Sequence, residues 1–515
     1  MTAMPTGIIA SLQSRVPTRG HQKPWPRYDV DAATWMQIGK ALAHGEGDLL
    51  ALWGEPKIVY MALRSPASAT PCVVSRDADD GEFPSIGVHH APAIRLERAV
   101  CDLYGLKAVG AHDVRPWLDH GAWGVRAPLG SRAPAELLVP TAYGFRRVIG
   151  DGLHQIPVGP VHAGIIEPGH FRFTANGETV ARLEARLGYV HKGADALLTG
   201  AALDKAARIV ARLSGDSTVA FSFAFARAVE AALDIHVPPR AQTLRGVMAE
   251  LERIANHFGD IGAICNDAAF ALIHAHCGIF REKVLAACDQ AFGHRLMMNE
   301  IVPGGVAQDI SADGVATIVA MLDNVTPAFA KVVRLYDDTP SLQDRTCSTG
   351  IVSRELVKQW AAGGHVGRAS GRDFDSRRDL AYAPYEGLAF EVPSFDAGDV
   401  DARVWVRIRE VEASILMLRG WLKALPEGAV RVAVPTAARG GEGIAMEGIA
   451  ITEAFRGDVL VWVRIGADAT VARCHVRDAS WFQWPLLEAA IENNIVADFP
   501  LCNKSFNCSY SGHDL

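Results

Sequence analysis

The sequence contains no CxxC pair, although it has nine cysteines among its 515 residues. An odd, scattered set of cysteines indicates reduced thiols rather than a disulfide framework.

Two nucleotide-binding signals are also missing. No GxGxxG follows a predicted strand, and the GxxxxG at Gly188–Gly193 is followed by Ala194 where a P-loop requires Lys. If NADH is used, we therefore expect another subunit to bind it.

Long hydrophobic runs are absent as well, since no stretch of about 18 apolar residues occurs. The N-terminus lacks a basic start followed by a long apolar core, so a secretory signal is not predicted. We expect a cytoplasmic chain that does not cross a membrane by itself. The net charge of −7 provides no basic field, which argues against nucleic acid as a partner.

Composition and periodicity divide the chain into four parts. Residues 1–27 are rich in Pro, Arg and Gln and are predicted to form a flexible arm. Residues 28–123 combine a helix with short strands, which is typical of a small α+β domain. Residues 124–149 are rich in Gly, Pro and Arg and are predicted to be a linker. Residues 150–515 begin with extended segments and become mainly helical.

The clearest predicted helix covers residues 241–258, where Leu244, Val247, Leu251, Ile254 and Phe258 recur at helical spacing. Further helices are expected at residues 32–44, 315–336 and 401–425, the second one kinked or interrupted near Pro327. Strands are expected at residues 57–63, 70–75, 169–174 and 179–187, with a hairpin formed by 459–465 and 471–476.

Five strings in the second part of the chain resemble, in their order, the large-subunit family shared by respiratory complex I and membrane-bound nickel-iron hydrogenases. They are GPVHAGIIEPGHFRF (Gly159–Phe173), RLGYVHKG (Arg186–Gly193), ELERIANH (Glu250–His257), RASGRDFDSRRD (Arg368–Asp379) and EAFRG (Glu453–Gly457). Upstream, FPSIGVHHAPAIRLERAVCDLYGL (Phe83–Leu106) is similar to the signature of the small peripheral-arm subunit of complex I. Such a fusion is typical of formate-hydrogenlyase-type large subunits.

The resemblance implies an α+β fold, with a small N-terminal α+β domain followed by a mainly helical, hydrogenase-like body with small edge sheets. It also implies a subunit of an oxidoreductase complex of the NADH-quinone oxidoreductase or hydrogenase type, passing electrons from an iron-sulfur small subunit to quinone or proton chemistry. Antiporter-like membrane subunits would hold it on the inner face of the cell membrane. The alternative is a non-catalytic scaffold that docks the iron-sulfur and membrane subunits.

The family binds its nickel-iron centre through two CxxC pairs. The resemblance places Ser214 and Ser217 at the first pair, and Ser509 and Gly512 at the second. A serine hydroxyl stays protonated near neutral pH and is a hard, poor ligand for nickel. The nickel-iron centre is therefore predicted to be absent, and no cofactor is assigned to this chain itself; the iron-sulfur cluster would belong to the partner subunit.

Other cysteines and histidines are expected to be structural. Cys502 and Cys508 are six residues apart, which does not match the family's chelate, although a metal role for them stays open. Cys265 and Cys277 lie in sequence near His274 and His276. On a helix these two histidines project about 200° apart, so they cannot converge on one ion.

The resemblance to complex I points to His170 as a residue that hydrogen-bonds a quinone head group. Gly215 takes the position of the family's second donor, a tyrosine. Asp267 matches an acidic residue that partners the histidine, so we expect it to orient the His170 imidazole and raise its pKa. A quinone cavity is therefore expected near His170, Gly215 and Asp267. The alternative is a purely structural hydrogen bond.

Charged residues in two motifs are expected to serve structure. Glu97, Arg98 and Asp102 match charged positions of the peripheral-arm signature. Because Arg98 and Asp102 are i, i+4 neighbours on a helix, we predict a surface or interdomain ion pair between them. Arg368, with Asp375 and Arg377, is expected to hold a loop together through arginine–carboxylate bonds.

Overall fold

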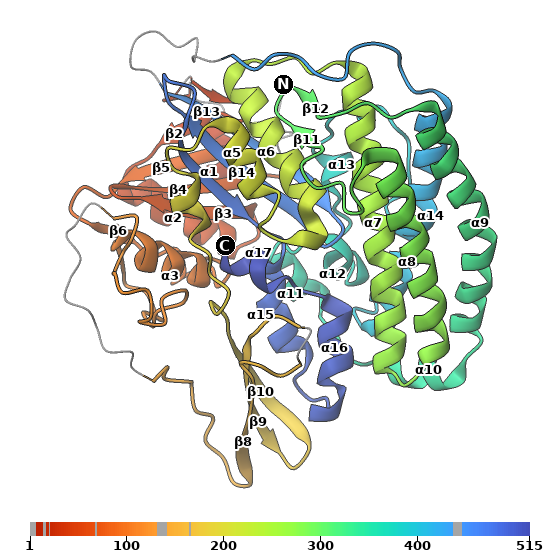
Figure 1. The fold of residues 1–515 in the computed structure, drawn as a ribbon. Coiled ribbons are helices and arrows are strands. Elements are labelled where there is room, and N and C mark those ends of the chain that lie inside the picture. Colours follow the sequence, from red (N-terminus) through yellow and green to blue (C-terminus); the bar gives the residue numbers. More distant parts are fainter. Residues whose placement is uncertain are drawn as a thin grey trace, which may run out of the picture.

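The computed structural model describes residues 7–13, 17–19, 21–66, 70–130, 142–163, 166–435 and 445–515. Its strands form small sheets, and its long helices gather on one side of the molecule (Figure 1). This arrangement confirms the predicted α+β class. Residues 131–141 of the predicted linker lie outside the described residues.

The N-terminal domain is built on a four-stranded sheet with the order β2-β5-β4-β3. Its strands are β2 (Arg27–Asp29), β3 (Asp48–Glu55), β4 (Ile58–Arg64) and β5 (Cys72–Asp77). Helices α2 (Ala32–Ala43) and α3 (Ala93–Tyr104) bury their apolar sides against one face of this sheet. The short strands β6 (Glu82–Pro84) and β7 (Lys107–Val109) pair beside them.

A second four-stranded sheet joins this domain to the body of the protein. It contains, in order, β1 (Gln22–Lys23), β13 (Met446–Ala454), β14 (Gly457–Ile465) and β15 (Val471–Arg477). Trp53 and Tyr60 of the first sheet share one core cluster with Ile449 and Trp462 of the second. The second sheet also packs against α4 (Ala194–Leu198), α5 (Leu203–Val210) and α6 (Thr218–Leu233).

The helical body is formed mainly by α7 (Pro239–Asp267), α8 (Ala271–Phe292), α9 (Ala312–Asp337) and α14 (Val400–Lys423), which share one hydrophobic core. Shorter helices follow α9: α10 (Pro340–Thr346), α11 (Arg354–Gln359), α12 (Gly364–Ala369) and α13 (Ser376–Asp379). The two-stranded ribbon of β11 (Ile301–Val302) and β12 (Gly305–Val306) precedes α9.

Of the kink or interruption expected near Pro327, the interruption is not present, because α9 continues through this residue. Pro327 lies on the exposed side of the helix, where water can reach the carbonyl that proline leaves without a donor. By length and composition α9 is also apolar enough to cross a membrane, although the sequence predicts no such segment. Its inner side packs against α8 and α14.

A three-stranded sheet with the order β10-β9-β8 projects at the bottom of Figure 1. Its strands are β8 (Leu153–Val158), β9 (His170–Asn176) and β10 (Thr179–Arg186). Phe171 and Phe173 of β9 pack on the C-terminal helices α15 (Ser480–Ala490) and α16 (Phe499–Phe506). The last helix, α17 (Tyr510–Asp514), lies next to α15.

The described part of residues 1–27 differs from the flexible arm that the sequence predicts. Ile9 and Leu12 of α1 (Ile8–Gln13) are buried, and so is Trp25. Strand β1 pairs in parallel with β13. The composition of residues 1–27 suggested a flexible arm. Burial of apolar side chains and the pairing of β1 with β13 instead hold the described part against the body of the protein.

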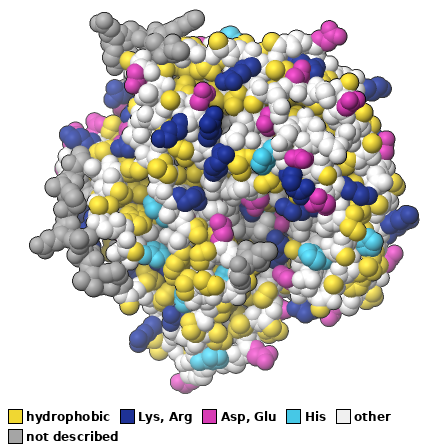
Figure 2. Space-filling view, viewed as in Figure 1, with side chains coloured by type: hydrophobic (Ala, Val, Ile, Leu, Met, Phe, Trp, Pro, Cys, Tyr) yellow, Lys and Arg dark blue, Asp and Glu magenta, His cyan; other side chains and the backbone are white. Residues whose placement is uncertain are grey.

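Charged and apolar side chains are unevenly distributed on the face drawn in Figure 2. Acidic and basic groups are mixed over the helical body. Hydrophobic side chains gather lower down, over the region where Figure 1 shows β8, β9 and β10.

We predict that Glu447→Ala strongly destabilises the junction of the two four-stranded sheets. Glu447 is 1% exposed; both of its oxygens lie 2.7 Å from Arg27 Nη1, and Arg464 donates to it as well. Removing one partner of a buried ion pair costs roughly 3–5 kcal/mol. Urea unfolding should show this loss, whereas Lys57→Ala, which breaks an exposed pair, should leave the midpoint unchanged. A similar midpoint for the two variants would contradict the prediction.

Candidate functional site

Three of the four positions that the sequence assigns to missing metal ligands carry serine, and two of these serines touch. Ser214 and Ser509 are separated by 295 positions in the sequence, yet their Oγ atoms lie 3.0 Å apart. The Ser509 Oγ also accepts a hydrogen bond of 2.9 Å from the Gly512 backbone N–H. The two halves of the expected site therefore meet in the fold.

Local structure explains how these segments reach one another. Ser214 precedes the 3-10 turn η1 (Gly215–Ser217), and Ser217 ends it where α6 begins. Ser509 is the N-cap of α17, and its backbone N–H donates to Ser480 at the start of α15. Helix starts expose unpaired N–H groups, which serine satisfies well. Ser509 therefore has a structural role here.

An ion pair lies beside the serines. Arg456 follows β13 in the EAFRG turn and holds Asp216 with two bonds, of 2.9 Å and 2.6 Å. Ser214 donates to the same carboxylate at 2.8 Å, and Arg456 also donates to Ser217. Although burial alone would raise the pKa of Asp216, the Arg456 guanidinium lowers it to about 2. Asp216 is therefore ionised and paired at neutral pH.

These residues do not fit a nickel-iron centre. A nickel site of this family needs soft thiolates, and the groups that meet here are hydroxyls and a hard carboxylate already bound to arginine. A side chain at Gly512 would approach Asp478 Oδ2 and Ser509 Oγ to 2.9 Å, so a cysteine there requires the surroundings to shift. In the part of the chain that the structure describes, no group of three or more His, Cys, Asp and Glu residues is placed to hold a metal.

The nearby cysteines are buried thiols. Burial raises the pKa of Cys502 to about 11 and raises that of Cys508 further, which disfavours the thiolate that binds metals. The structure brings Cys265 and Cys277 close together in the core between α7 and α8, and burial raises the pKa of each thiol. His274, in contrast, is exposed.

His170 begins β9 and lines a cavity of about 810 Å³. Its Nδ1 lies 3.2 Å from the Gly159 carbonyl, and Arg172 Nε donates to its Nε2 at 3.3 Å. Both contacts suit one neutral tautomer, with the proton on Nδ1. Burial lowers the pKa of His170, which agrees with that assignment.

The expected pair of His170 and Asp267 is not formed in the structure. Among the described residues no hydrogen bond or ion pair joins them, and neither Gly215 nor Asp267 lines the cavity beside His170. Asp267 lies at the end of α7. Partial desolvation raises the pKa of its carboxyl, whereas Lys504 opposes that shift. The family position is matched in sequence, but the end of α7 and the start of β9 are not brought together.

The charged residues of the peripheral-arm signature are also placed differently from the prediction. Glu97 is buried and accepts hydrogen bonds from Ser85 Oγ and from backbone N–H groups of the same loop. Arg98 reaches Asp113 at 3.3 Å, whereas Asp102 accepts from three successive backbone N–H groups that begin at Trp117. The predicted Arg98–Asp102 ion pair is therefore wrong, because loop groups supply both partners.

The predicted role of Arg368 as a structural connector agrees with its contacts. Its Nη1 lies 3.4 Å from Asp375, which Arg377 contacts at 2.6 Å. Arg368 also binds Glu410 of α14 and Glu453 of β13. This fully buried group joins four elements of the fold.

Two features of the site were missed by reasoning from sequence. The first is the Arg456–Asp216 pair, although Arg456 lies in the quoted EAFRG string and Asp216 lies between the two serines. The second is His162, in the loop between β8 and β9, which lies 3.4 Å from the Tyr510 hydroxyl. Sequence spacing does not predict either contact, because the two partners lie hundreds of residues apart along the chain.

Comparison with known proteins supports the resemblance. The family model described as "Respiratory-chain NADH dehydrogenase, 49 Kd subunit" matches residues 268–446. Formate hydrogenlyase subunit 5 of Escherichia coli (strain K12) is 30% identical over 454 residues, covering 86% of this chain and 78% of that protein. The chain belongs to this hydrogenase-like large-subunit family.

Two further similarities describe the extent of the match. The carbon monoxide-induced hydrogenase of Rhodospirillum rubrum is 29% identical over 356 residues, covering 69% of this chain and 97% of that protein. A chain from the structure of the membrane-bound sulfane sulfur reductase, an archaeal respiratory membrane complex, has a TM-score of 0.66 at 22% identity. It covers 72% of this chain and all of that chain, which shows a shared fold. Since relatives of this family belong to multisubunit membrane complexes, a membrane and further subunits are expected here.

We predict that the double variant S214C/S509C forms a cross-link under mild oxidation, because the two serine oxygens are already in contact. Peptide mapping without reduction should find one linked peptide that contains both substituted positions. Each single variant is the control for exchange with the native Cys508. Two free thiols at the substituted positions would contradict the placement of these segments.

Proposed function

We propose that this chain is the large subunit of a membrane-associated complex-I-like or hydrogenase-like oxidoreductase complex that works without a nickel-iron centre. It takes electrons from an iron-sulfur small subunit and passes them to quinone or proton chemistry. Antiporter-like membrane subunits hold it at the cytoplasmic side of the membrane. The observation that carries the proposal is the contact of Ser214 with Ser509, which keeps the family's architecture with ligands unsuited to nickel.

Hydrogen bonds leading away from the serines tie the site to the helical body. Ser214 donates to Asp216, whose partner Arg456 also donates to the backbone carbonyl of Asn507. The Asn507 side chain in turn donates to Asp260 of α7 at 2.9 Å. Such a chain of polar groups connects the site to the interior of the helical body.

His170 is the proposed proton-handling residue. Its neutral imidazole lines the cavity, and its lowered pKa keeps Nε2 unprotonated near neutral pH, where it accepts a hydrogen bond from Arg172. Asp267 is kept as a second candidate because of its place in the family pattern, although it lies apart from His170.

The test is to isolate the complex from membranes through a tag on this chain and to compare turnover of the wild type with that of His170→Ala. Reduced methyl viologen serves as donor and a short-chain ubiquinone as acceptor. Loss of a general acid–base group typically costs about 100-fold or more in rate. We expect such a loss with subunit composition unchanged in mass spectrometry. His154→Ala, which removes an exposed histidine from β8 of the same sheet, is the matched control and should retain full turnover.

The second candidate function is a scaffold that docks other subunits without taking part in redox chemistry. It is favoured by the Arg456–Asp216 pair, which lies between the serines and already satisfies their hydroxyls. If the chain is such a scaffold, both His170→Ala and Asp267→Ala leave the turnover of the assembled complex unchanged. That result would contradict the redox proposal.

A further inference from the structure

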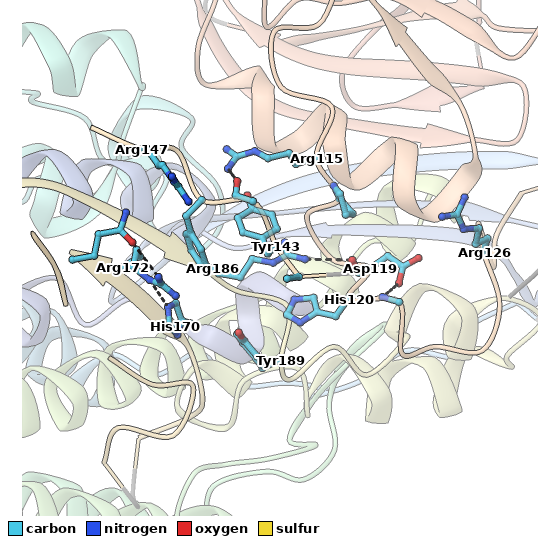
Figure 3. Close-up of a pocket in the computed structure, with 16 residues that line it drawn as sticks. Arg115, Asp119, His120, Arg126, Tyr143, Arg147, His170, Arg172, Arg186 and Tyr189 are labelled. Carbon is cyan, nitrogen blue, oxygen red and sulfur yellow. Dashed lines mark hydrogen bonds between the residues drawn. The ribbon is translucent and has the colours of Figure 1, made fainter. Parts of the chain in front are cut away.

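The imidazole of His170 is held at both of its nitrogens by neighbouring groups. Arg172 lies two residues further along β9, so the two side chains project from the same face of the sheet. Figure 3 shows them next to each other, with the hydrogen bond from Arg172 to His170 drawn as a dashed line. On the opposite side of the ring, Nδ1 faces the Gly159 carbonyl. The ring orientation is therefore fixed by one donor and one acceptor.

The guanidinium of Arg172 is itself held in place by other segments. Its Nη1 donates to Gln155 of β8 at 3.2 Å, and its carbon lies 4.6 Å from the centre of the Phe145 ring. The same Phe145 ring lies 5.1 Å from the ring of His170. Arginine and histidine therefore pack on one aromatic side chain, and β8, β9 and the segment of residues 142–147 together set their separation.

The positive charge of Arg172 is not neutralised by the carboxylate nearest to it in the sheet. Glu184 of β10 is paired with Arg172 in the strand register, which places the two side chains on one face. The Glu184 carboxylate is already occupied, because it accepts hydrogen bonds from the Arg115 side chain and the Arg146 backbone N–H. Within the described residues Arg172 has no ion pair, so its charge acts on the imidazole beside it.

A donor at Nε2 and a nearby positive charge both favour an unprotonated nitrogen there. Burial lowers the pKa of His170, and the Arg172 charge lowers it as well, whereas the Gly159 carbonyl raises it. The other charged or titratable groups that line the cavity make no hydrogen bond or ion pair to His170 in the described structure. Besides Arg115, they are Asp119, His120, Arg126, Tyr143, Arg147, Arg186 and Tyr189.

We propose that Arg172 is a positioning residue for His170, whose imidazole it holds at the cavity wall in the neutral form with the proton on Nδ1. Arg172 does not itself react in this account. The inference deepens the proposed function, on which it rests for the part that His170 plays in turnover. It assigns to one side chain the control of the pH range in which Nε2 of His170 is unprotonated.

Deuterium exchange at the imidazole Cε1 of His170 tests the inference in the isolated complex. The exchange rate rises with pH and levels off above the pKa of the ring, and fragment ions in mass spectrometry resolve it for each histidine. For the wild type we expect a midpoint below the ordinary histidine value of about 6.5. Arg172→Met removes the charge and the donor, so the midpoint should move upward.

Two further substitutions at the same position separate the role of the side chain from a general loss of structure. Arg172→Gln removes the charge but keeps a polar side chain, and its midpoint should also move upward. Arg172→Lys keeps the charge and N–H donors, so its midpoint should return toward that of the wild type. A midpoint that is equal in the wild type and in Arg172→Gln would overturn the proposal.

The matched control is Arg147→Met. It removes the same charge from an exposed arginine that lines the same cavity and, within the described residues, has no contact with His170. This variant should leave the His170 midpoint at its wild-type value. Exposed His154 of β8 is the internal reference and should exchange alike in all of these proteins. Equal upward shifts of the His170 midpoint in Arg147→Met and Arg172→Met would overturn the proposal.

The pH profile of turnover connects this role to the reaction. His170→Ala identifies the limb of the profile that depends on His170, because that limb disappears with the imidazole. In Arg172→Met the same limb should move to higher pH, together with the exchange midpoint. An unshifted limb would overturn the proposal. The exchange measurement involves no electron transfer, so it still decides how Arg172 acts on His170 if His170→Ala leaves turnover unchanged and the proposed function fails.

Discussion

Pairing of buried arginines with carboxylates is the interaction on which the rest of this structure depends. Arg368 contacts Glu410 and Glu453, and Arg377 contacts Glu250, all of them almost fully buried. Breaking such a pair leaves a charge in the interior at high cost. Helices α7, α12, α13 and α14 and strand β13 must therefore assemble together, and they bring the EAFRG turn to the serine cluster. Arg456 extends the same principle to the edge of the site, where it neutralises Asp216.

These ion pairs explain how the chain keeps the fold of its family without the family's metal ligands. The ion pairs that place the segments depend on arginine and carboxylate groups that the chain retains. The ligand positions depend on sulfur, which Ser214, Ser217, Ser509 and Gly512 do not supply. Hydroxyl groups at those positions bond to one another and to Asp216, so the site is stable as a polar cluster.

The parts of the fold that could be predicted from the sequence are those set by local patterns. The helical repeat predicted α7, and the apolar segments predicted β14 and β15. The family's two CxxC positions predicted that Ser214 and Ser509 belong to one site. Contacts fixed by tertiary neighbours could not be predicted in this way. Asp102 binds loop N–H groups rather than Arg98, and His170 bonds to Gly159 rather than to Asp267, because the chain supplies closer partners. The packed residues near the N-terminus were missed for the same reason.

The most direct test of the central claim is the nickel content of the complex isolated from membranes of cells grown with ample nickel. Inductively coupled plasma mass spectrometry on the tagged complex measures nickel against the amount of this chain. We predict nickel far below one atom per chain, because hydroxyls and an arginine-bound carboxylate occupy the ligand positions. One nickel atom per chain, bound after extensive dialysis, would contradict this prediction.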